Sequence, residues 1–202
     1  MKLYSRPTPL RCHSATGISL IELLIALAIM AFLLTNVGLP GFRDTANRHD
    51  IDAAVRDLID AISMARSAAI SENVMVTLCR SSDGKLCKGS WENGSILFTD
   101  FNADRVMNGN DRLLFRFPAL KPQGTLTFNS FRNQQYLQLT PRGATNNQNG
   151  NFTFCPANGD PRLIRQLIIN ITGRARVAPD TNKDGIVENS EGKPVECKAT
   201  GK

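Results

Sequence analysis

The sequence predicts an α+β protein in which a long N-terminal helix is followed by mainly antiparallel β-structure. Three observations support this prediction. An apolar run begins at residue 18, a segment with helical periodicity follows it, and short strand-like segments separated by turns fill the remainder. Because helical segments do not alternate with these strands, a parallel sheet is not expected.

The N-terminal run changes abruptly from basic to apolar. Residues 1–17 carry three basic residues and no acid, whereas Glu22 is the single ionisable side chain in residues 18–41. At about 1.5 Å per residue, a helix over residues 18–41 would cross a hydrocarbon core of about 30 Å. Basic residues keep the preceding end cytoplasmic. The run therefore predicts a single pass of the inner membrane, with the rest of the chain in the periplasm.

Glu22 is unusual inside such a run. A carboxylate in an apolar membrane segment is unfavourable, so its presence is by default a functional hypothesis. Two alternatives compete with it. A secretory signal peptide would need a small-residue cleavage site after the run, and residues 34–38 offer none. A plain membrane anchor has no use for an acid at this position.

The remaining chain is long enough for one domain with a single core. Pro40 and Gly41 are expected to break or bend the first helix. Between Arg43 and Asn73, apolar residues recur at steps of three and four, which predicts an amphipathic helix packed on its own sheet; a partner helix is the alternative. Strands are predicted at residues 74–80, 95–100, 113–117, 125–128, 136–140, 152–155, 167–171 and 174–178.

Four cysteines follow the N-terminal run, and an even number suits an oxidising compartment. Four cysteines allow three connectivities. A turn-forming Ser-Asp-Gly at 82–84, read as a hairpin turn, favours Cys79 with Cys87, which leaves Cys155 with Cys197. A zinc site is not favoured, because the sequence lacks close Cys-x-x-Cys pairs and nearby histidines.

Positive charge is concentrated in residues 112–176, which contain nine basic residues, eight of them arginine, and a single acid, Asp160. The guanidinium fork suits phosphate, and clustered cations release counterions when a polyanion binds. The charge therefore makes a nucleic-acid partner plausible, and because nothing resembles a recognition helix, such binding would not depend on sequence. The aromatic residues of this part are too widely spaced in the sequence to predict stacking on single strands: Phe128, Phe131, Tyr136 and Phe152.

The strongest candidate contact is the stretch Gly173-Arg174-Ala175-Arg176. On a strand, Arg174 and Arg176 would share one face, and Gly173 would let a turn approach a ligand closely. A solvated strand face, or pairing with acids of a neighbouring subunit, is the alternative. The predicted DNA-binding set is Gly173, Arg174, Arg176, Arg142, Arg165 and Arg162.

Calcium is the one cofactor that the sequence suggests. Residues 180–191 fit the 12-residue calcium-loop pattern, with ligands expected at Asp180, Asn182, Asp184 and Glu191. Asp100 to Asp111 form a poorer version of the pattern. Asx-turns, in which short polar side chains bond their own backbone, explain both without metal.

No Ser-His-Asp, Cys-His or phosphate-loop pattern is present, so the sequence predicts no enzyme.

The stretch Gly17-Ile-Ser-Leu-Ile-Glu22 and the apolar run after it resemble the signal of type IV pilins and type II secretion pseudopilins. The resemblance implies that prepilin peptidase cleaves after Gly17 and methylates the new terminus at Ile18. It also implies that Glu22 pairs with a neighbouring pilin's terminal amine during assembly. The expected fold is then a type IV pilin-like long helix, half transmembrane and half amphipathic, on β-sheet.

Further blocks resemble the FimT and GspH branch of minor pilins. They are the W-x-x-G-hydrophobic-F-x-D-x-N-x-D pattern at residues 91–104, Pro141-Arg142-Gly143, and residues 171–176. In the FimT branch a G-R-x-R element is associated with DNA binding during uptake. The resemblance implies a minor pilin of a cell-surface pilus; the alternatives are the minor pseudopilin H of type II secretion and a structural or adhesive pilin.

The expected organisation therefore has four parts. They are a leader at residues 1–17 that is removed, a transmembrane and assembly helix at 18–41, a periplasmic pilin domain at 42–178, and a tail with the acidic loop at 179–202.

Overall fold

A computed structural model describes residues 17, 19–35, 39–121 and 123–197. The chain divides into two units between Asp44 and Thr45. All the strands of the described residues, and both disulfides, belong to the second unit.

The first unit contains helix α1, Leu20–Leu33, whose side chains are all exposed and almost all apolar. Within the described residues no helix combines the length and the apolar character needed to cross a bilayer. Part of the expected span, Ile18 and residues 36–38, lies outside those residues.

Helix α2, Leu39–Glu72, is the predicted amphipathic helix, but it begins earlier than expected. Pro40 and Gly41 lie in its first turn and do not end a helix, because amide groups of a first turn have no intrahelical acceptor and a proline is tolerated there. Beyond Glu72 the backbone of Asn73 turns to a left-handed φ of 52°. The buried stripe of α2 includes Ala61, Ile62, Ala65 and Ala69.

Two four-stranded antiparallel sheets form the β-structure. The first has the order β3-β2-β1-β5, and the second β4-β6-β7-β8. All eight predicted strands are present, with ends that differ by two residues or fewer. Their bounds are β1 Val76–Arg80, β2 Ser95–Thr99, β3 Leu113–Phe117, β4 Gly124–Ser130, β5 Tyr136–Leu139, β6 Gly150–Pro156, β7 Arg165–Ile169 and β8 Ala175–Val177. Short 3-10 helices are η2 Trp91–Asn93, η3 Phe131–Asn133 and η4 Pro161–Leu163.

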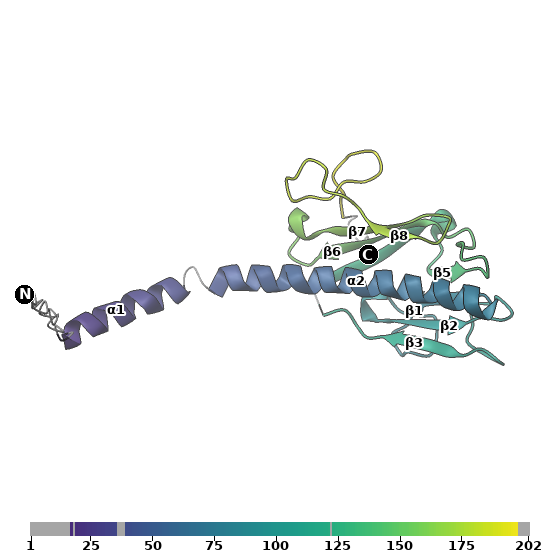
Figure 1. The fold of residues 1–202 in the computed structure, drawn as a ribbon, viewed down its shortest axis with the longest axis horizontal. Coiled ribbons are helices and arrows are strands. Elements are labelled where there is room, and N and C mark those ends of the chain that lie inside the picture. The colour runs from purple at the N-terminus through teal and green to yellow at the C-terminus, as the bar shows by residue number, and fades with distance from the viewer. Residues whose placement is uncertain (1–16, 18, 36–38, 122, 198–202) are drawn as a thin grey trace, which may run out of the picture. The chain divides into compact units, whose positions relative to one another are not determined.

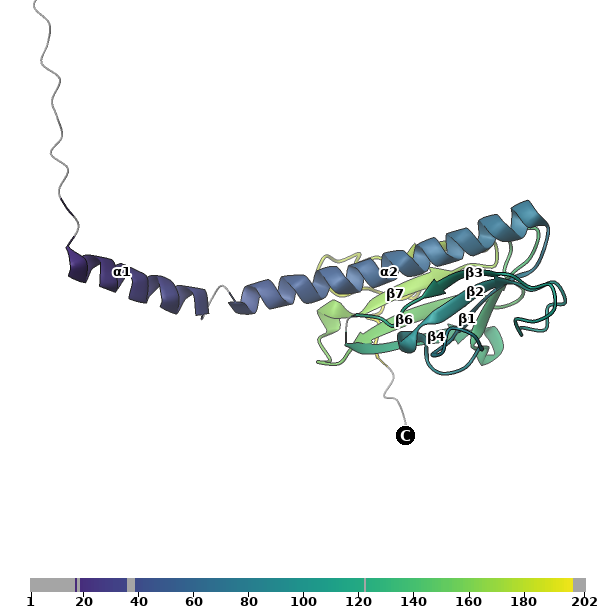
Figure 2. The same cartoon turned by 90° about the horizontal axis from the view of Figure 1, so that it is seen from below.

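One core joins both sheets to α2. Figure 1 shows β6, β7 and β8 above the axis of α2 and β1, β2 and β3 below it, and in Figure 2, turned by 90°, the strands lie together below the helix. Leu78 and Leu137 of the first sheet and Leu167 of the second bury their side chains in the same cluster as the stripe of α2. Trp91 of η2 packs edge-on against Phe152, with ring centroids 4.8 Å apart. The predicted packing of an amphipathic helix on antiparallel sheet is therefore confirmed.

The two disulfides join Cys79 to Cys87 and Cys155 to Cys197, the pairs that the sequence favours. The reason given for the first pair needs a correction. Cys79 lies in β1, but Cys87 lies in the connection to β2, so residues 82–84 are not the tip of a β-hairpin. Instead the carboxylate of Asp83 accepts hydrogen bonds from the backbone amides of residues 85 and 86, at 2.8 and 2.9 Å.

Residues 179–197 fold onto the second sheet. Val187 and Val195 are buried in a small cluster with Ile164 and Ala178, and the disulfide from Cys197 ties the same segment to Cys155 in β6. The residues from 179 to 197 are thus part of the second unit.

Candidate nucleic-acid interface

Two turns that are far apart in the sequence lie against each other. The first, residues 141–143, follows β5, and the second, residues 171–174, joins β7 to β8. The backbone amide of Thr145 donates to the carbonyl of Ile171 at 2.9 Å and so links the two segments. The second and third sequence blocks of the family resemblance therefore meet in one place.

Glycine is strongly favoured in both turns. Gly143 and Gly173 have left-handed φ angles of 74° and 73°. A Cβ atom on Gly173 would lie 2.3 Å from the carbonyl oxygen of Gly143, and one on Gly143 would lie 2.7 Å from Cδ1 of Ile70 on α2. Arg66 of α2 donates from Nε to the Gly143 carbonyl oxygen at 3.0 Å. The glycine before Arg174 thus has a packing reason that needs no ligand.

This packing places three arginines at the surface of the paired turns. Arg142 and Arg174 lie in the two turns and Arg176 in β8, and all three are exposed. None of them forms an ion pair within the part of the chain that the structure describes. We call this set the arginine patch: Arg142, Arg174 and Arg176.

The backbone of Arg174 is held firmly. Its amide donates to Oδ1 of Asn170 at 3.0 Å, and its carbonyl accepts from the amide of Asn170 at 3.1 Å. Thr172 donates from its hydroxyl to the same Oδ1 at 2.7 Å. The strand begins one residue later than predicted, at Ala175, because these contacts close the turn through Arg174.

Arg162 and Arg165 lie at the other end of β7 and do not join the arginine patch. From the first to the last of its five residues, β7 advances about 13 Å at 3.3 Å per residue. Arg165 donates from Nε to Asp52 of α2 at 2.8 Å and from Nη1 to two backbone carbonyls, and its side chain is only 14% exposed. The predicted DNA-binding arginines therefore form two separate groups. In the second group, Arg165 holds α2 on the second sheet through its pair with Asp52.

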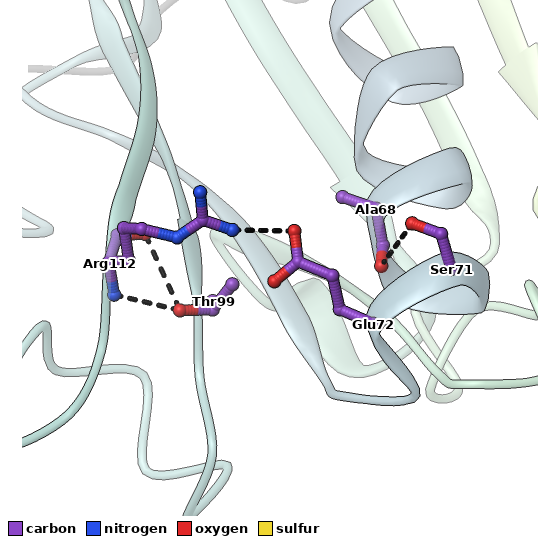
Figure 3. A network of polar contacts seen from close by, with 5 residues as sticks. All are labelled: Ala68, Ser71, Glu72, Thr99 and Arg112. Carbon is purple, nitrogen blue, oxygen red and sulfur yellow. Dashed lines mark hydrogen bonds and ion pairs between the residues drawn. The ribbon is translucent and has the colours of Figure 1, made fainter.

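Arg112, another member of the basic segment, is also paired with α2. Its guanidinium forms an ion pair with Glu72 at 2.6 Å, and its backbone amide donates to the hydroxyl of Thr99 at 2.7 Å; Figure 3 shows both contacts. Acids of the helix thus neutralise two of the arginines that the sequence places in a basic half.

The predicted processing residues lie in the first unit. Gly17 is exposed, and Glu22 lies exposed in the first turn of α1, where the helix dipole favours a negative charge. Ile18 lies outside the described residues, so cleavage and methylation there remain predictions.

The acidic loop at residues 180–191 is closed by its own hydrogen bonds. The amide of Gly185 donates to Asp180 at 2.9 Å, and the amide of Thr181 donates to Glu188 at 2.7 Å and so lowers the pKa of that buried carboxyl. Asn182 and Asp184 bond each other, at 2.9 Å between their side chains.

Glu191, the expected last ligand of a calcium loop, is exposed and pairs with Lys193 at 3.2 Å. Among the described residues no group of three or more His, Cys, Asp or Glu side chains is arranged to hold a metal ion. The hydrogen bonds that close this loop are those of Asx-turns, in which short polar side chains bond nearby backbone amides. Calcium binding at Asp180, Asn182, Asp184 and Glu191 stays a prediction.

Asp100, from the poorer calcium pattern, is a buried structural residue. Its Oδ2 accepts hydrogen bonds from the hydroxyl of Thr77 at 2.6 Å, from Nε2 of Gln138 at 3.0 Å and from the amide of Arg105 at 3.1 Å. Asp104 in the same loop accepts the amide of Val106, which lowers the pKa of its carboxyl. This loop thus organises the ends of β1, β2 and β5.

Comparisons with known proteins agree with this architecture. A family model described as type II transport protein GspH matches residues 54–173, and one described as the prokaryotic N-terminal methylation motif matches residues 12–35. No curated protein is significantly similar to the chain.

Among solved structures, the type IV minor pilin FimU of Pseudomonas aeruginosa strain PAO1, in space group P21, is similar with a TM-score of 0.52 and 19% identity over 65% of this chain and 90% of that chain. Its second crystal form, in space group P65, has a TM-score of 0.48 and 19% identity over 63% and 92% of the two chains. At this identity the likeness in space group P21 shows a shared fold.

Proposed function

Because the chain belongs to the GspH family of type IV minor pilins and pseudopilins, we propose that it is a minor pilin that binds DNA without sequence preference and supports DNA uptake in natural transformation. The proposed contact is the arginine patch. Family membership implies contact with other pilins, and it supports a structural rather than an enzymatic role.

The observation that carries this proposal is the meeting of the two glycine turns. Arg142 and Arg174 lie in turns that pack directly against each other, and Arg176 follows two residues beyond Arg174. Rigid backbone beneath long cationic side chains is suited to phosphates, because the guanidinium fork can bond two phosphate oxygens. Contacts of this type position a protein on DNA but read no sequence.

Processing at the N-terminus belongs to the same proposal. Prepilin peptidase would cleave after Gly17 and methylate Ile18, within the segment that matches the methylation motif. The chain would be anchored in the inner membrane with its second unit in the periplasm, before Glu22 pairs with another pilin's terminus and draws it into a cell-surface pilus.

A second candidate function has its own support. The matching family model carries the name of a type II transport protein, which favours a minor pseudopilin of a secretion system that needs no DNA. A structural or adhesive minor pilin is the third candidate. If the chain is a pseudopilin or a structural or adhesive pilin, the arginine patch has no role in DNA capture.

The test is a gel-shift titration of duplex DNA with the full chain in a non-ionic detergent. Replacing Arg174 and Arg176 by Gln removes two phosphate contacts, so we expect at least a tenfold loss of affinity for duplexes of any sequence. The control variant, Arg116→Gln with Lys121→Gln, makes the same change of charge on exposed residues away from the patch.

Equal losses in the two double variants would mean that general charge, and not the arginine patch, attracts DNA. Absence of binding by the unmutated chain would contradict the proposal and favour the pseudopilin.

A further inference from the structure

A second surface feature lies beside η3, where a cavity of about 290 Å³ opens between the start of β5 and the segment that runs antiparallel to it. Its lining combines two aromatic rings, side-chain amides and one arginine, and it contains no acid. The residues used below are Phe131, Arg132, Gln134, Tyr136, Asn147 and Gln148.

The cavity brings together aromatic residues that looked dispersed in the sequence. Phe128 and Phe152 are buried and stack on each other in the core, with centroids 4.2 Å apart. Phe131, in contrast, is 57% exposed, and it shares the cavity with Tyr136. A large apolar ring left in solvent at the mouth of a cavity is a surface on which a flat ring can stack.

The backbone around Phe131 is held in an unfavourable conformation. Arg132, Asn133 and Asn147 have left-handed φ angles of 63°, 52° and 64°, and Arg132 is a residue type that rarely adopts them. The hydroxyl of Ser130 donates to the carbonyl of Gln134 at 2.9 Å and so closes the turn. Such strain is concentrated at binding sites, where the surrounding structure maintains it.

The amides of the cavity leave one acceptor without a donor. The Oε1 atom of Gln134 is shielded from solvent and has no hydrogen-bond partner. Nearby, Gln148 is only 2% exposed, and its Oε1 accepts the amide of Gln138 at 3.2 Å. A shielded carbonyl oxygen without a donor is costly, and a rotation of the Gln134 side chain towards the cavity would let an N–H group of a ligand satisfy it.

We propose that this cavity holds one nucleobase of single-stranded DNA. The base stacks on Phe131, and the Gln134 side chain rotates so that its Oε1 accepts an amino or imino N–H of the base. Arg132, whose guanidinium now lies 5.4 Å from the centroid of the Phe131 ring, exchanges this cation–π contact for a phosphate oxygen. An unpaired strand is required because a base in a duplex presents no free ring face.

This proposal rests on the proposed function and deepens it by naming the form of DNA. The cavity lies at the Tyr136 end of β5, and the strand leads at its other end to the turn that carries Arg142. From residue 136 to residue 140 the backbone advances about 13 Å at 3.3 Å per residue. A few nucleotides cover that distance, so one strand can reach the arginine patch and the cavity together.

Fluorescence anisotropy tests the proposal with a labelled 12-nucleotide single strand and the duplex of the same sequence. The full chain in a non-ionic detergent is compared with Phe131→Ala and Phe131→Leu, and both variants are checked by thermal melting. Since Phe131 is mostly exposed, the fold should tolerate either change. We expect about 5- to 100-fold weaker binding to the single strand and less than a twofold change for the duplex.

The matched control is Phe115→Ala, which removes another exposed phenylalanine, 43% accessible, from β3. Its affinity for both DNA forms should stay unchanged. The double variant of Arg174 and Arg176 should weaken both forms, and if it weakens neither while Phe131→Ala weakens the single strand, the arginine patch is wrong and the cavity stands.

The cavity proposal is overturned if both Phe131 variants leave single-strand affinity unchanged or weaken the two DNA forms equally. Binding of neutral oligosaccharides at Phe131 with no single-strand binding by the unmutated chain would also overturn it.

Discussion

Gly173 shows how a short motif can have a structural cause at one residue and a functional one at the next. A Cβ on this residue would lie 2.3 Å from the carbonyl oxygen of Gly143, and its φ of 73° disfavours other residues independently. Arg174 and Arg176 have no comparable constraint from packing, because both are exposed. The motif therefore divides into a glycine that positions the turn and arginines that are free to bind.

Replacing Gly173 by Ala should lower the free energy of unfolding by about 1–3 kcal/mol, since it adds a clash with backbone to left-handed strain. Gly159→Ala is the matched control. Gly159 has nearly the same φ, 71°, but open space around the added carbon, so its variant reports strain alone. Urea unfolding of both variants measures the difference, and equal losses would show that contact with the Gly143 carbonyl does not require glycine.

Asp83 makes the first disulfide loop sensitive to pH. The amides of Leu86 and Lys85, in that order, hold the pKa of its carboxyl well below its usual range, with Lys88 adding an ion pair at 3.3 Å. A lowered pKa in the folded state means that the ionised form stabilises the fold above the unfolded pKa, near 3.9. This contribution is lost as the pH falls through that value towards the folded pKa.

We therefore expect Asp83→Asn to be less stable than the unmutated chain at pH 7, and the difference to shrink as the pH is lowered from 5 to 2. Urea midpoints across this range measure it. Asp60→Asn makes the same change of charge on the exposed face of α2 and serves as the control. A difference for Asp83→Asn that does not vary with pH would contradict the assigned role of its charge.

At the scale of elements, the sequence predicted the helix from its hydrophobic periodicity and the strands from the turn residues between them. The buried stripe of α2 and the positions of the strands were readable, because the first depends on residues three and four positions apart and the second on strand-forming residues between turns. The pairing of Arg165 with Asp52 was not readable, since 113 positions separate the two residues and only the docking of α2 on β7 brings them together. For the same reason the sequence grouped Arg165 with the arginines of the β7–β8 turn.

The two disulfides constrain elements of different length and should differ in their effect. Cys79 and Cys87 are 8 positions apart, whereas Cys155 and Cys197 are 42 apart and hold the whole C-terminal segment on the second sheet. Loop-closure entropy predicts losses of about 2.5 and 4 kcal/mol when each pair is replaced by serine. Thermal unfolding of the two double variants compares them, and a larger loss for the short loop would show that closure entropy does not dominate.

At the scale of the whole molecule, charge is the property that sequence and structure describe differently. The sequence assigns nine basic residues and one acid to residues 112–176. In the folded chain, acids of α2 neutralise Arg112 and Arg165, and Arg162 lies at the far end of β7 from the arginine patch. Three arginines remain together at the paired turns. Counting charges along the sequence does not separate them from the other basic residues of the segment.

This difference predicts the salt dependence of duplex binding. If the three arginines of the patch contact phosphates, the logarithm of the affinity should fall with the logarithm of salt concentration with a slope of about −2.7, because each contact contributes about −0.9. Engagement of all nine basic residues would give a slope near −8. Titrations at several potassium chloride concentrations measure this slope, and replacing Arg142, Arg174 and Arg176 by Gln should bring it close to zero.

A slope near −8, or one that these replacements leave unchanged, would mean that the basic segment as a whole binds DNA. The packing of the two glycine turns would then have no bearing on DNA binding.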